Sequence, residues 1–248
     1  MRCIDLNCDL GEGAGHDAEL MPLITSANIA CGLHAGDAAT MRRAVEQALR
    51  HRVALGAHPS LNDREHFGRR ELKVLPDEAH ELVLTQTRLL QVIARQCGGR
   101  VAHVKPHGGL YNLAARDAAL AAAVADAVHE ADPRLILFGL AGSELIRAGQ
   151  ARGLRVAREA FADRTYQADG SLTPRPQPNA LITDEDAAVA QVLRMVRAGK
   201  VRATDGTEAS IQADTICLHG DSAHPVEFAR RLHEELRKAS IEIKAPSQ

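Results

Sequence analysis

Short hydrophobic runs alternate with longer amphipathic stretches along this chain. The runs are rich in strand-favouring residues and predict seven strands, at residues 3–8, 27–31, 53–57, 101–105, 135–139, 154–159 and 215–218. The stretches between them carry apolar residues at helical spacing and predict six helices, at residues 38–52, 77–97, 117–131, 143–152, 184–198 and 225–239. This alternation is typical of an α/β protein with a parallel sheet.

Two segments depart from the alternation. Residues 163–179 include three prolines and an Asp-Gly pair, which predicts a long, stiffened loop that serves either as a lid or as a plain connector. Residues 200–212 have an Asp-Gly turn between two β-prone runs and predict a β-hairpin at the edge of the fold.

Length and motifs favour one α/β architecture. A chain of 248 residues has about the length of one (β/α) barrel, so we expect a single domain over residues 1–248. An open doubly wound sheet would also alternate, but its GxGxxG fingerprint is missing. We therefore predict a seven-stranded (β/α) barrel. The GxxxxGK(S/T) loop is missing too, so no motif indicates a nucleotide site.

Composition narrows the range of partners. The chain has 30 Lys and Arg residues and 32 Asp and Glu residues, so it lacks the basic excess that nucleic-acid binding needs. Aromatic residues make up 2%, which favours small polar substrates over sugars. The sequence has no signal-like segment and no apolar stretch of membrane-spanning length, so we expect a cytoplasmic protein without a membrane partner. The five cysteines form no CxxC pair, and we expect reduced thiols.

Polar residues cluster where five of the predicted strands end, at residues 5–9, 31–37, 56–59, 104–108 and 217–221. A parallel barrel brings the carboxyl ends of its strands together on one face. These clusters therefore predict an enzyme site assembled from distant parts of the chain.

Side-chain alternation places the acids of the first predicted strand. Asp5, Asn7 and Asp9 share one face, which we expect to point into the barrel. Asp9 is nearest the strand end and is the stronger candidate for chemistry. Glu12, in the turn that follows, is a further candidate acid.

Lys105 is expected to point inward from the fourth strand, on the same face as His103 and His107. A buried ammonium group needs a carboxylate partner or an anionic ligand, and either Asp9 or the substrate could supply it. The alternative is a buried Lys–Asp pair that orders the barrel without taking part in chemistry.

Four histidines lie at corresponding strand ends, His34, His58, His107 and His219. Each alone would be an ordinary core residue, but together they favour a shared site for acid–base chemistry or ligand binding. Asp9, His34 and His58 would form a reasonable three-ligand set for a divalent metal. No HxxxH or HExxH pair puts two ligands on one predicted helix, so the metal interpretation depends on the fold.

An arginine-rich loop follows His58. Arg64, Arg69 and Arg70 could bind a carboxylate or a phosphate through paired hydrogen bonds. A solvated basic loop is the other interpretation.

The polar motifs together resemble those of a known family. They are DLNCDLGE at residues 5–12, SANIACGLHAGD at 26–37, GAHPS at 56–60, KPHGGLYN at 105–112, EAFADR at 159–164 and LHGD at 218–221. In this order they are similar to the LamB/YcsF family, which supplies the A subunit of prokaryotic ATP-dependent 5-oxoprolinase.

The resemblance implies a fold, a reaction and partners. The fold would be a barrel related to glycoside hydrolases and polysaccharide deacetylases. The reaction would be the opening of 5-oxoproline to L-glutamate as ATP, usually with Mg²⁺, is hydrolysed to ADP and phosphate. Two other subunits, B and C, would take part. Metal-dependent members of the wider superfamily bind through positions that Asp9, His34 and His58 match.

The resemblance and the residue patterns give one set of expected site residues. The expected catalytic residues are Asp9, Glu12, His58, Lys105 and His107. The expected substrate-binding residues are Asn7, Asn28, His34, Asp37, Arg64, Arg69, Arg70, Tyr111, Asn112, Glu159, Asp163, Arg164, His219 and Asp221.

Two other functions stay open at this point. A stand-alone metal-dependent amidohydrolase or carbohydrate deacetylase would act without ATP and lose activity on chelation. A non-catalytic subunit would bind substrate or act as a scaffold, and its variants would change affinity or assembly and leave turnover intact.

Overall fold

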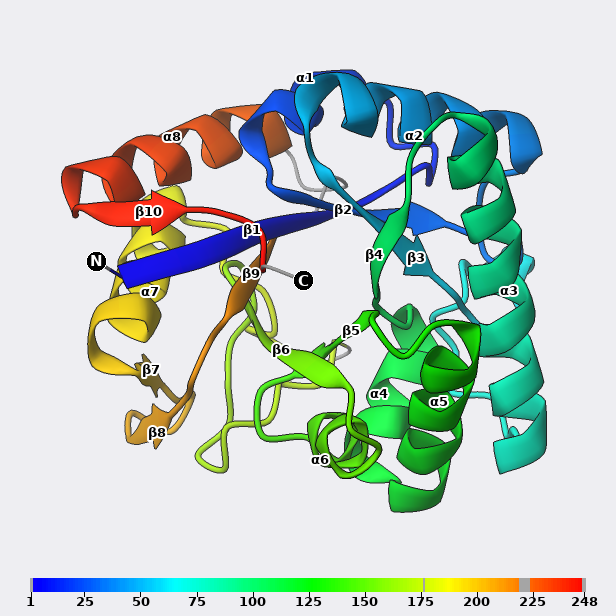
Figure 1. The fold of residues 1–248 in the computed structure, drawn as a ribbon. Coiled ribbons are helices and arrows are strands. Elements are labelled where there is room, and N and C mark those ends of the chain that lie inside the picture. Colours follow the sequence, from blue (N-terminus) through cyan, green and yellow to red (C-terminus); the bar gives the residue numbers. More distant parts are fainter. Residues whose placement is uncertain (1, 176, 219–223, 247–248) are drawn as a thin grey trace.

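Seven parallel strands close into a barrel, as the sequence predicts. The computed structural model describes residues 2–175, 177–218 and 224–246. The barrel strands are β1 (Arg2–Leu10), β2 (Ser26–Ala30), β3 (Ala54–His58), β4 (Val101–Val104), β5 (Ile136–Leu140), β6 (Arg155–Phe161) and β9 (Thr215–Leu218). Each pairs with the next in this order, and β9 pairs with both β6 and β1, which closes the ring (Figure 1).

Helices surround the strands (Figure 1). The longer ones are α2 (Ala38–His51), α3 (Pro76–Gln96), α4 (Gly108–Arg116), α5 (Ala118–Ala131), α6 (Glu144–Ala151), α7 (Glu185–Ala198) and α8 (Pro225–Lys238). Short helical turns are α1 (Asp17–Leu20), η1 (Met21–Leu23) and η2 (Arg64–His66). The six predicted helices are present. The sequence did not predict α4, which opens on two glycines and so lacks a helix-like start.

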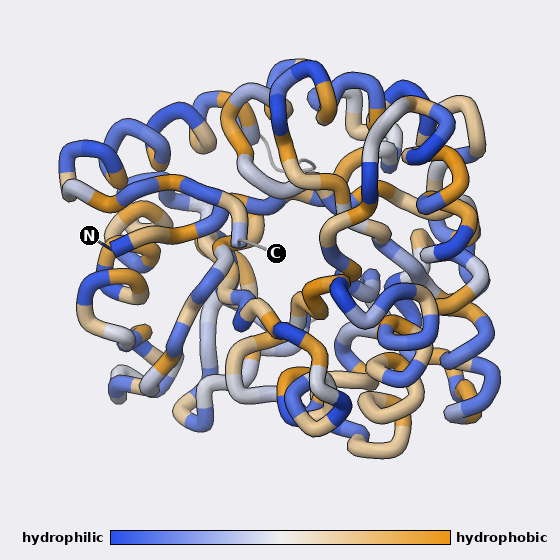
Figure 2. Tube along the Cα trace, in the orientation of Figure 1, coloured by the Kyte–Doolittle hydropathy of each residue, from blue (hydrophilic) through white to orange (hydrophobic). Residues whose placement is uncertain are grey.

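The hydrophobic core lies between the barrel and the helices. On β1, Ile4, Leu6 and Cys8 are buried in this layer, while the residues between them are polar and bond inside the barrel. Figure 2 shows hydrophobic and hydrophilic positions alternating along the outer helices, which bury one face and expose the other. The strands are therefore packed on both sides. Apolar side chains lie outside, and the interior holds the polar side chains together with a smaller apolar cluster of Ile136, Phe138 and Ala157, in which Phe138 stacks on His103.

Local capping explains where several helices begin and end. The Asp37 carboxylate accepts a hydrogen bond from the Thr40 amide at 2.7 Å and caps α2. Asp184 caps α7 in the same way through the Ala187 amide, at 2.8 Å. Gly199 ends α7 in the left-handed conformation, with φ of 64°.

Small elements decorate the barrel. β7 (Lys200–Arg202) and β8 (Glu208–Ser210) form the predicted antiparallel hairpin. β10 (Ile241–Ile243) pairs in parallel with the start of β1. The sequence did not predict β10, because three residues are too few to show a strand pattern. The described residues of segment 163–182 form a hydrogen-bonded loop, in which the Thr165 amide donates to the Ala180 oxygen and the Thr173 amide to the Thr165 oxygen.

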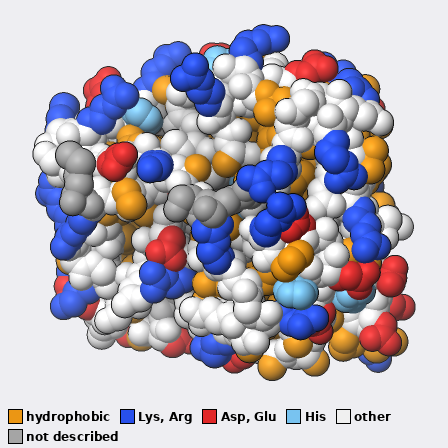
Figure 3. Space-filling model, in the orientation of Figure 1, with side chains coloured by type: hydrophobic (Ala, Val, Ile, Leu, Met, Phe, Trp, Pro, Cys, Tyr) orange, Lys and Arg blue, Asp and Glu red, His pale blue; other side chains and the backbone are white. Residues whose placement is uncertain are grey.

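Charges are spread over the surface. Figure 3 shows one face, on which Lys and Arg side chains are interspersed with Asp and Glu and apolar side chains form small separate patches. None of the helices in the described part of the chain has the length and apolar character that a membrane span needs. The five cysteines are free, and Cys8, Cys31 and Cys217 are buried.

Candidate active site at the carboxyl ends of the barrel strands

A cavity of about 890 Å³ opens where the barrel strands end. This volume is near the upper end of the range for small-molecule sites, about 300–1,000 Å³. The expected site residues that line it are Asp9, Glu12, His58, Arg69, Lys105, His107, Tyr111, Asn112 and Arg164.

The deepest polar layer of the barrel holds Asp5. Its carboxylate accepts hydrogen bonds from Thr25 at 2.6 Å, Ser26 at 2.8 Å and Thr215 at 2.5 Å. Burial raises the pKa of Asp5 to about 6, because three hydroxyl donors do not replace the lost water completely. Asp5 therefore lies below the cavity as part of the barrel interior.

Two asparagines form the next layer. Asn28 donates from Nδ2 to Asn7 Oδ1 and to Asp9 Oδ1, both at 2.8 Å. Its Oδ1 accepts from His103 Nε2 at 2.8 Å, so His103 carries its proton on Nε2. Asn7 Nδ2 donates to Glu159 at 3.0 Å and to Thr215 at 2.7 Å. These amides fix the carboxylates above them and do not line the cavity.

Lys105 joins this layer to the cavity. Its Nζ lies 2.9 Å from Asp9 Oδ1, 2.8 Å from Glu159 Oε1 and 3.1 Å from Asn7 Oδ1, and the residue is only 2% exposed. Burial opposes the charged ammonium group, but Asp9 and Glu159 outweigh it and hold the pKa of Lys105 well above its usual value. The expected carboxylate partner of Lys105 is therefore Asp9, together with Glu159.

Tyr111 covers the other side of Glu159. Its hydroxyl donates to Glu159 Oε2 at 2.7 Å, and burial followed by the charge of Glu159 holds the pKa of Tyr111 well above its usual value. Tyr111 therefore stays a neutral donor. Glu159 is completely buried and reaches the cavity only through its partners Tyr111 and Lys105.

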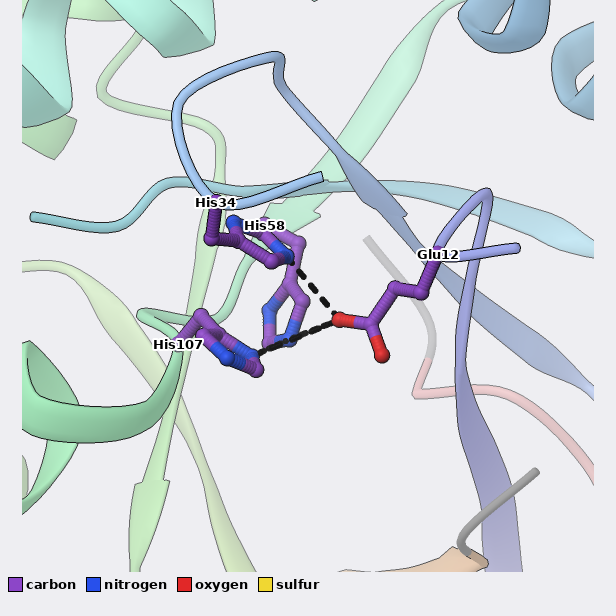
Figure 4. A group of neighbouring side chains, drawn as sticks. All are labelled: Glu12, His34, His58 and His107. Carbon is purple, nitrogen blue, oxygen red and sulfur yellow. Dashed lines mark hydrogen bonds and ion pairs between the residues drawn. The ribbon is translucent and has the colours of Figure 1, made fainter. Parts of the chain in front are cut away.

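Three histidines and one carboxylate meet in the cluster that Figure 4 shows. Asp9 lies beside it, with Oδ2 3.3 Å from His58 Nε2. Glu12 comes from the turn after β1, His34 from the loop after β2, His58 from the end of β3 and His107 from the residue before α4. Glu12 Oε1 lies 2.9 Å from His34 Nε2, 3.4 Å from His107 Nδ1 and 3.7 Å from His58 Nε2. One ligand atom from each residue lies within 4.8 Å of the other three.

Backbone carbonyls orient two of these rings. His58 Nδ1 lies 2.7 Å from the Lys105 oxygen, and His107 Nε2 lies 2.9 Å from the Phe67 oxygen. A carbonyl only accepts, so each of these nitrogens carries a proton. The other nitrogens, His58 Nε2 and His107 Nδ1, face each other at 2.9 Å.

Burial and neighbouring charges shift the pKa values of the site's acids and bases in different directions. Burial, then the charge of His58, lowers the pKa of His107 to about 3. For His58 burial acts in the same direction, but Asp9 outweighs it and raises the pKa. Burial opposes ionisation of Asp9, but His58 and Lys105 outweigh it and hold its pKa well below the usual value. Burial and the nearby Asp9 raise the pKa of Glu12. An ionised carboxylate thus lies beside one that is easier to protonate, as acid–base pairs require.

Arginines line the opposite wall. Arg164 is 6% exposed and donates from Nη2 to the Thr173 oxygen at 2.6 Å and from Nε to the Ala180 oxygen at 3.2 Å. Burial, then the charge of Arg175, lowers the pKa of Arg164. No carboxylate in the described part of the chain lies within ion-pair distance of Arg164. Arg69 lies over the Phe67 ring, 5.0 Å from its centroid.

Some expected site residues lie elsewhere. Asp37 is the cap of α2, and Arg64 donates to the Gly36 oxygen. Arg70 pairs with Asp63, and Asp163 is outside the cavity lining. The structure does not bring these residues to the cavity. His219 and Asp221 lie outside the described residues.

The cavity also includes residues that the sequence did not single out. They are Glu71, Pro106, Gly108, Ala115, Arg116, Leu140, Phe161, Gln167, Ser171, Leu172, Thr173, Pro174 and Arg175. Many belong to the predicted loop, whose length was a signal that did not identify individual residues. Arg116 is on α4, so missing this helix also concealed Arg116 and its hydrogen-bonded partner Glu71.

The chain is similar to known proteins over nearly its whole length. The chain is 56% identical over 250 residues to the A subunit of 5-oxoprolinase from Geobacillus kaustophilus, which covers 99% of this chain and 98% of that protein. It is also similar to the crystal structure of a lactam utilization protein from Thermus thermophilus, with a TM-score of 0.93, 44% identity and coverage of 99% and 100% of the two chains.

The same barrel occurs in more distant proteins. A family 4 carbohydrate esterase from Streptomyces lividans superposes with a TM-score of 0.50 at 12% identity, over 99% of this chain and 93% of that one. This likeness concerns the fold alone. The LamB/YcsF family matches residues 4–248, and the chain belongs to it.

Proposed function

We propose that this chain is the A subunit of an ATP-dependent 5-oxoprolinase, which opens the lactam of 5-oxoproline to L-glutamate. The observation that carries the proposal is the full-length match, at 56% identity, to a protein of that name. The match to a lactam utilization protein supports the same substrate class. The two other subunits, B and C, with ATP and its Mg²⁺, complete the proposed enzyme.

The use of ATP has a chemical reason. A five-membered lactam is unstrained, and water attacks its carbonyl carbon slowly. Transfer of the γ-phosphoryl group of ATP to the lactam oxygen releases ADP and leaves that carbon activated. Water then adds to the carbon, the C–N bond breaks and the nitrogen takes up a proton, which leaves an acyl phosphate on the side-chain carboxyl group. A second water hydrolyses this acyl phosphate and releases phosphate and L-glutamate.

The cavity offers a placement for 5-oxoproline. Arg164 is buried without a carboxylate partner in the described structure, and the substrate carries a carboxylate. Binding through a guanidinium–carboxylate pair would balance this charge. The lactam ring would then lie toward Asp9 and Glu12, on the acidic and histidine-lined side of the cavity.

The expected catalytic residues have complementary properties in this placement. Asp9 is ionised and can accept a proton from water, while Glu12 has a raised pKa and can return a proton to the leaving nitrogen. His107 Nδ1 lies 3.4 Å from Glu12 Oε1 and 2.9 Å from His58 Nε2, so it can connect the two groups for proton exchange. Lys105 holds the Asp9 carboxylate in place from below.

The test is glutamate release from 5-oxoproline in an extract of the source organism from which this chain has been deleted. Adding the purified chain should restore release only when ATP is present. Glu12→Gln should reduce the restored rate at least about 100-fold, the usual contribution of a general acid or base. Glu235→Gln, on the surface of α8, is the matched control and should restore fully. No restoration by the wild type, with the other subunits shown to be present, would refute the proposal.

One observation supports a second candidate, a stand-alone metal-dependent hydrolase. The histidine–carboxylate cluster has the residue types that such enzymes use. This candidate predicts turnover by the purified chain without ATP and loss of that turnover on chelation. The same assay, run on the isolated chain, separates the two.

A further inference from the structure

We infer that Glu12, His34, His58 and His107 bind one divalent transition-metal ion, with Zn²⁺ the best match. The four side chains come from four segments of the chain and point toward one another (Figure 4). The inference is tested by binding to this chain alone, apart from the proposed lactam reaction. With the ion bound, Glu12, His58 and His107 are its ligands, and the proton-transfer roles proposed for them above apply to the metal-free chain.

Proton positions give the first reason. Both His58 and His107 use their outer N–H to hold a backbone carbonyl. In the neutral form, His58 Nε2 and His107 Nδ1 therefore both present lone pairs, at a separation of only 2.9 Å. Two lone pairs at that distance repel, so a cation or a shared proton has to lie between them. Metal-binding histidines characteristically donate their second N–H to a carbonyl or carboxylate, as these two do.

Ligand spacing gives the second reason. Zn–N and Zn–O bonds of about 2.0–2.1 Å in a tetrahedron place neighbouring ligand atoms roughly 3.3 Å apart. The four short separations here are 2.9, 2.9, 3.4 and 3.7 Å, two on either side of that value. All the separations among the four ligand atoms are within 4.8 Å. The His34 and His107 rings are stacked, with centroids 3.9 Å apart and planes 5° from parallel, so one of these rings has to turn for the four ligand atoms to converge on an ion.

The donor set selects the class of ion. Three imidazoles and one carboxylate suit Zn²⁺ and its first-row neighbours, whereas Mg²⁺ and Ca²⁺ prefer sites built from oxygen. The Phe67 ring contacts both His34 and His107, with ring centroids 5.6 Å apart in each case. This apolar neighbour limits water access and holds the two rings.

Asp9 is outside the inferred ligand set. Its Oδ1 already accepts from Lys105 at 2.9 Å and from Asn28 at 2.8 Å. Its Oδ2 lies 3.3 Å from His58 Nε2, as a neighbour of a ligand. The set expected from the sequence, Asp9 with His34 and His58, is thus replaced by one in which Glu12 and His107 take part. A bound ion would supply Lewis-acid chemistry at the cavity floor.

The test is titration of the chelator-treated chain with ZnCl2 by calorimetry, with elemental analysis of the product. We expect one ion per chain. Glu12→Gln and His107→Gln should each weaken binding more than about 100-fold, since even outer-shell changes cost 10–100-fold. With Co²⁺, the wild type should develop the intense visible absorption of a tetrahedral site, which both variants should lose.

Two controls keep the result specific. His80→Gln removes a histidine on α3, outside the cluster, and should bind as the wild type does. Asp9→Asn should keep one-to-one binding if Asp9 is not a ligand. The inference is overturned if the wild type takes up no stoichiometric ion, if Glu12→Gln and His107→Gln bind normally, or if Asp9→Asn abolishes binding and Glu12→Gln does not. Circular dichroism excludes misfolding as the cause of lost binding.

Discussion

Lys105 is the residue on which the polar interior of the barrel converges. Its ammonium group is hydrogen-bonded to Asn7 and Asp9, and it also pairs with Glu159. Sequence reasoning left two possible partners, Asp9 or a substrate anion, and the structure favours Asp9. Because these acceptors occupy Lys105 fully, a substrate carboxylate needs another cation. Arg164 lines the cavity with no carboxylate of the described residues within ion-pair distance, and so is the candidate that we favour.

Replacing Lys105 should destabilise the fold. Lys105→Met would leave Asp9 and Glu159 buried without their cation, which typically costs about 3–5 kcal/mol. Urea unfolding at neutral pH measures the loss. Lys238→Met on α8 removes only a solvent-exposed ion pair and should leave the free energy of unfolding nearly unchanged. Equal stability of the two variants would mean that the interior tolerates the unpaired carboxylates.

Asp5 should make stability depend on pH. Its folded pKa of about 6 is above the ordinary value of 3.8, so the folded state holds this proton more tightly than the unfolded state. This contribution is complete below about pH 4 and is lost as pH rises through 6, a change of up to roughly 3 kcal/mol. Asp5→Asn cannot titrate. Relative to this variant, the wild type should lose stability between pH 4 and pH 7, and a constant difference would contradict the assignment.

Arg164 should distinguish substrates by their carboxylate. Arg164→Gln should raise the KM for 5-oxoproline by about 10-fold or more, the scale of a charged hydrogen bond of roughly 1.5–3 kcal/mol. It should leave competition by 2-pyrrolidinone, the same lactam without a carboxylate, unchanged. If binding of both compounds weakens equally, Arg164 shapes the cavity without pairing with the carboxylate.

At the scale of elements, the loop after β3 and the start of α4 shape the cavity, and the strands hold these segments in place. Gly68, with φ of 65°, carries a carbonyl that accepts from the Gly109 amide at 2.8 Å and so holds the loop after β3 against α4. A Cβ at Gly68 would lie 2.8 Å from the His34 Cβ and 3.1 Å from His107 Cδ2. An added side chain would crowd His34 and His107, so this position requires glycine.

Gly68→Ala should impair the site more than the fold. Gly98→Ala is a matched control, because Gly98 also has positive φ, of 79°, but nothing within 4 Å of an added Cβ. Both variants should lose about 1–2 kcal/mol from backbone strain. Only Gly68→Ala should also lose glutamate release and Zn²⁺ affinity. If the two variants behave alike, contact with the histidines does not matter.

Sequence and structure agree where a pattern has enough length to be read. The barrel strands and six helices follow from periodicity and capping, and the inward direction of Asp9 and Lys105 follows from strand alternation. The glycine-rich start of α4 concealed that helix, and three residues were too few to reveal β10. Arg64 and Arg70 were assigned to the site because they follow His58, but sequence cannot show which way a loop side chain points. Arg64 turns to the Gly36 oxygen and Arg70 to Asp63.

At the scale of the molecule, the barrel divides its side chains into an apolar outer layer and an interior that is polar except for the cluster around Phe138. The outer layer packs against the helices, and the interior leads from Asp5 up to Glu12 and the histidines. A cavity of about 890 Å³ is much larger than one small lactam needs. It has room for an activated intermediate or for a segment of a partner chain.

The complete enzyme should couple its two reactions tightly. In the proposed reaction each turnover phosphorylates one lactam oxygen, so one ADP should form for each glutamate released. Both products can be measured in the same reaction. Omitting this chain should abolish glutamate formation, and glutamate formed in excess of ADP would contradict an ATP-driven opening.

The pairing of β10 with the start of β1 has a practical consequence. Arg2 and Ile241 are partners in this register, so the first and last strands meet at one end of the barrel. Asp9 is seven residues further along β1, roughly 23 Å away at about 3.3 Å per residue. A tether attached near either strand would thus anchor the protein to a sensor surface with the cavity mouth facing outward, accessible to injected metal ions, lactams and partner subunits.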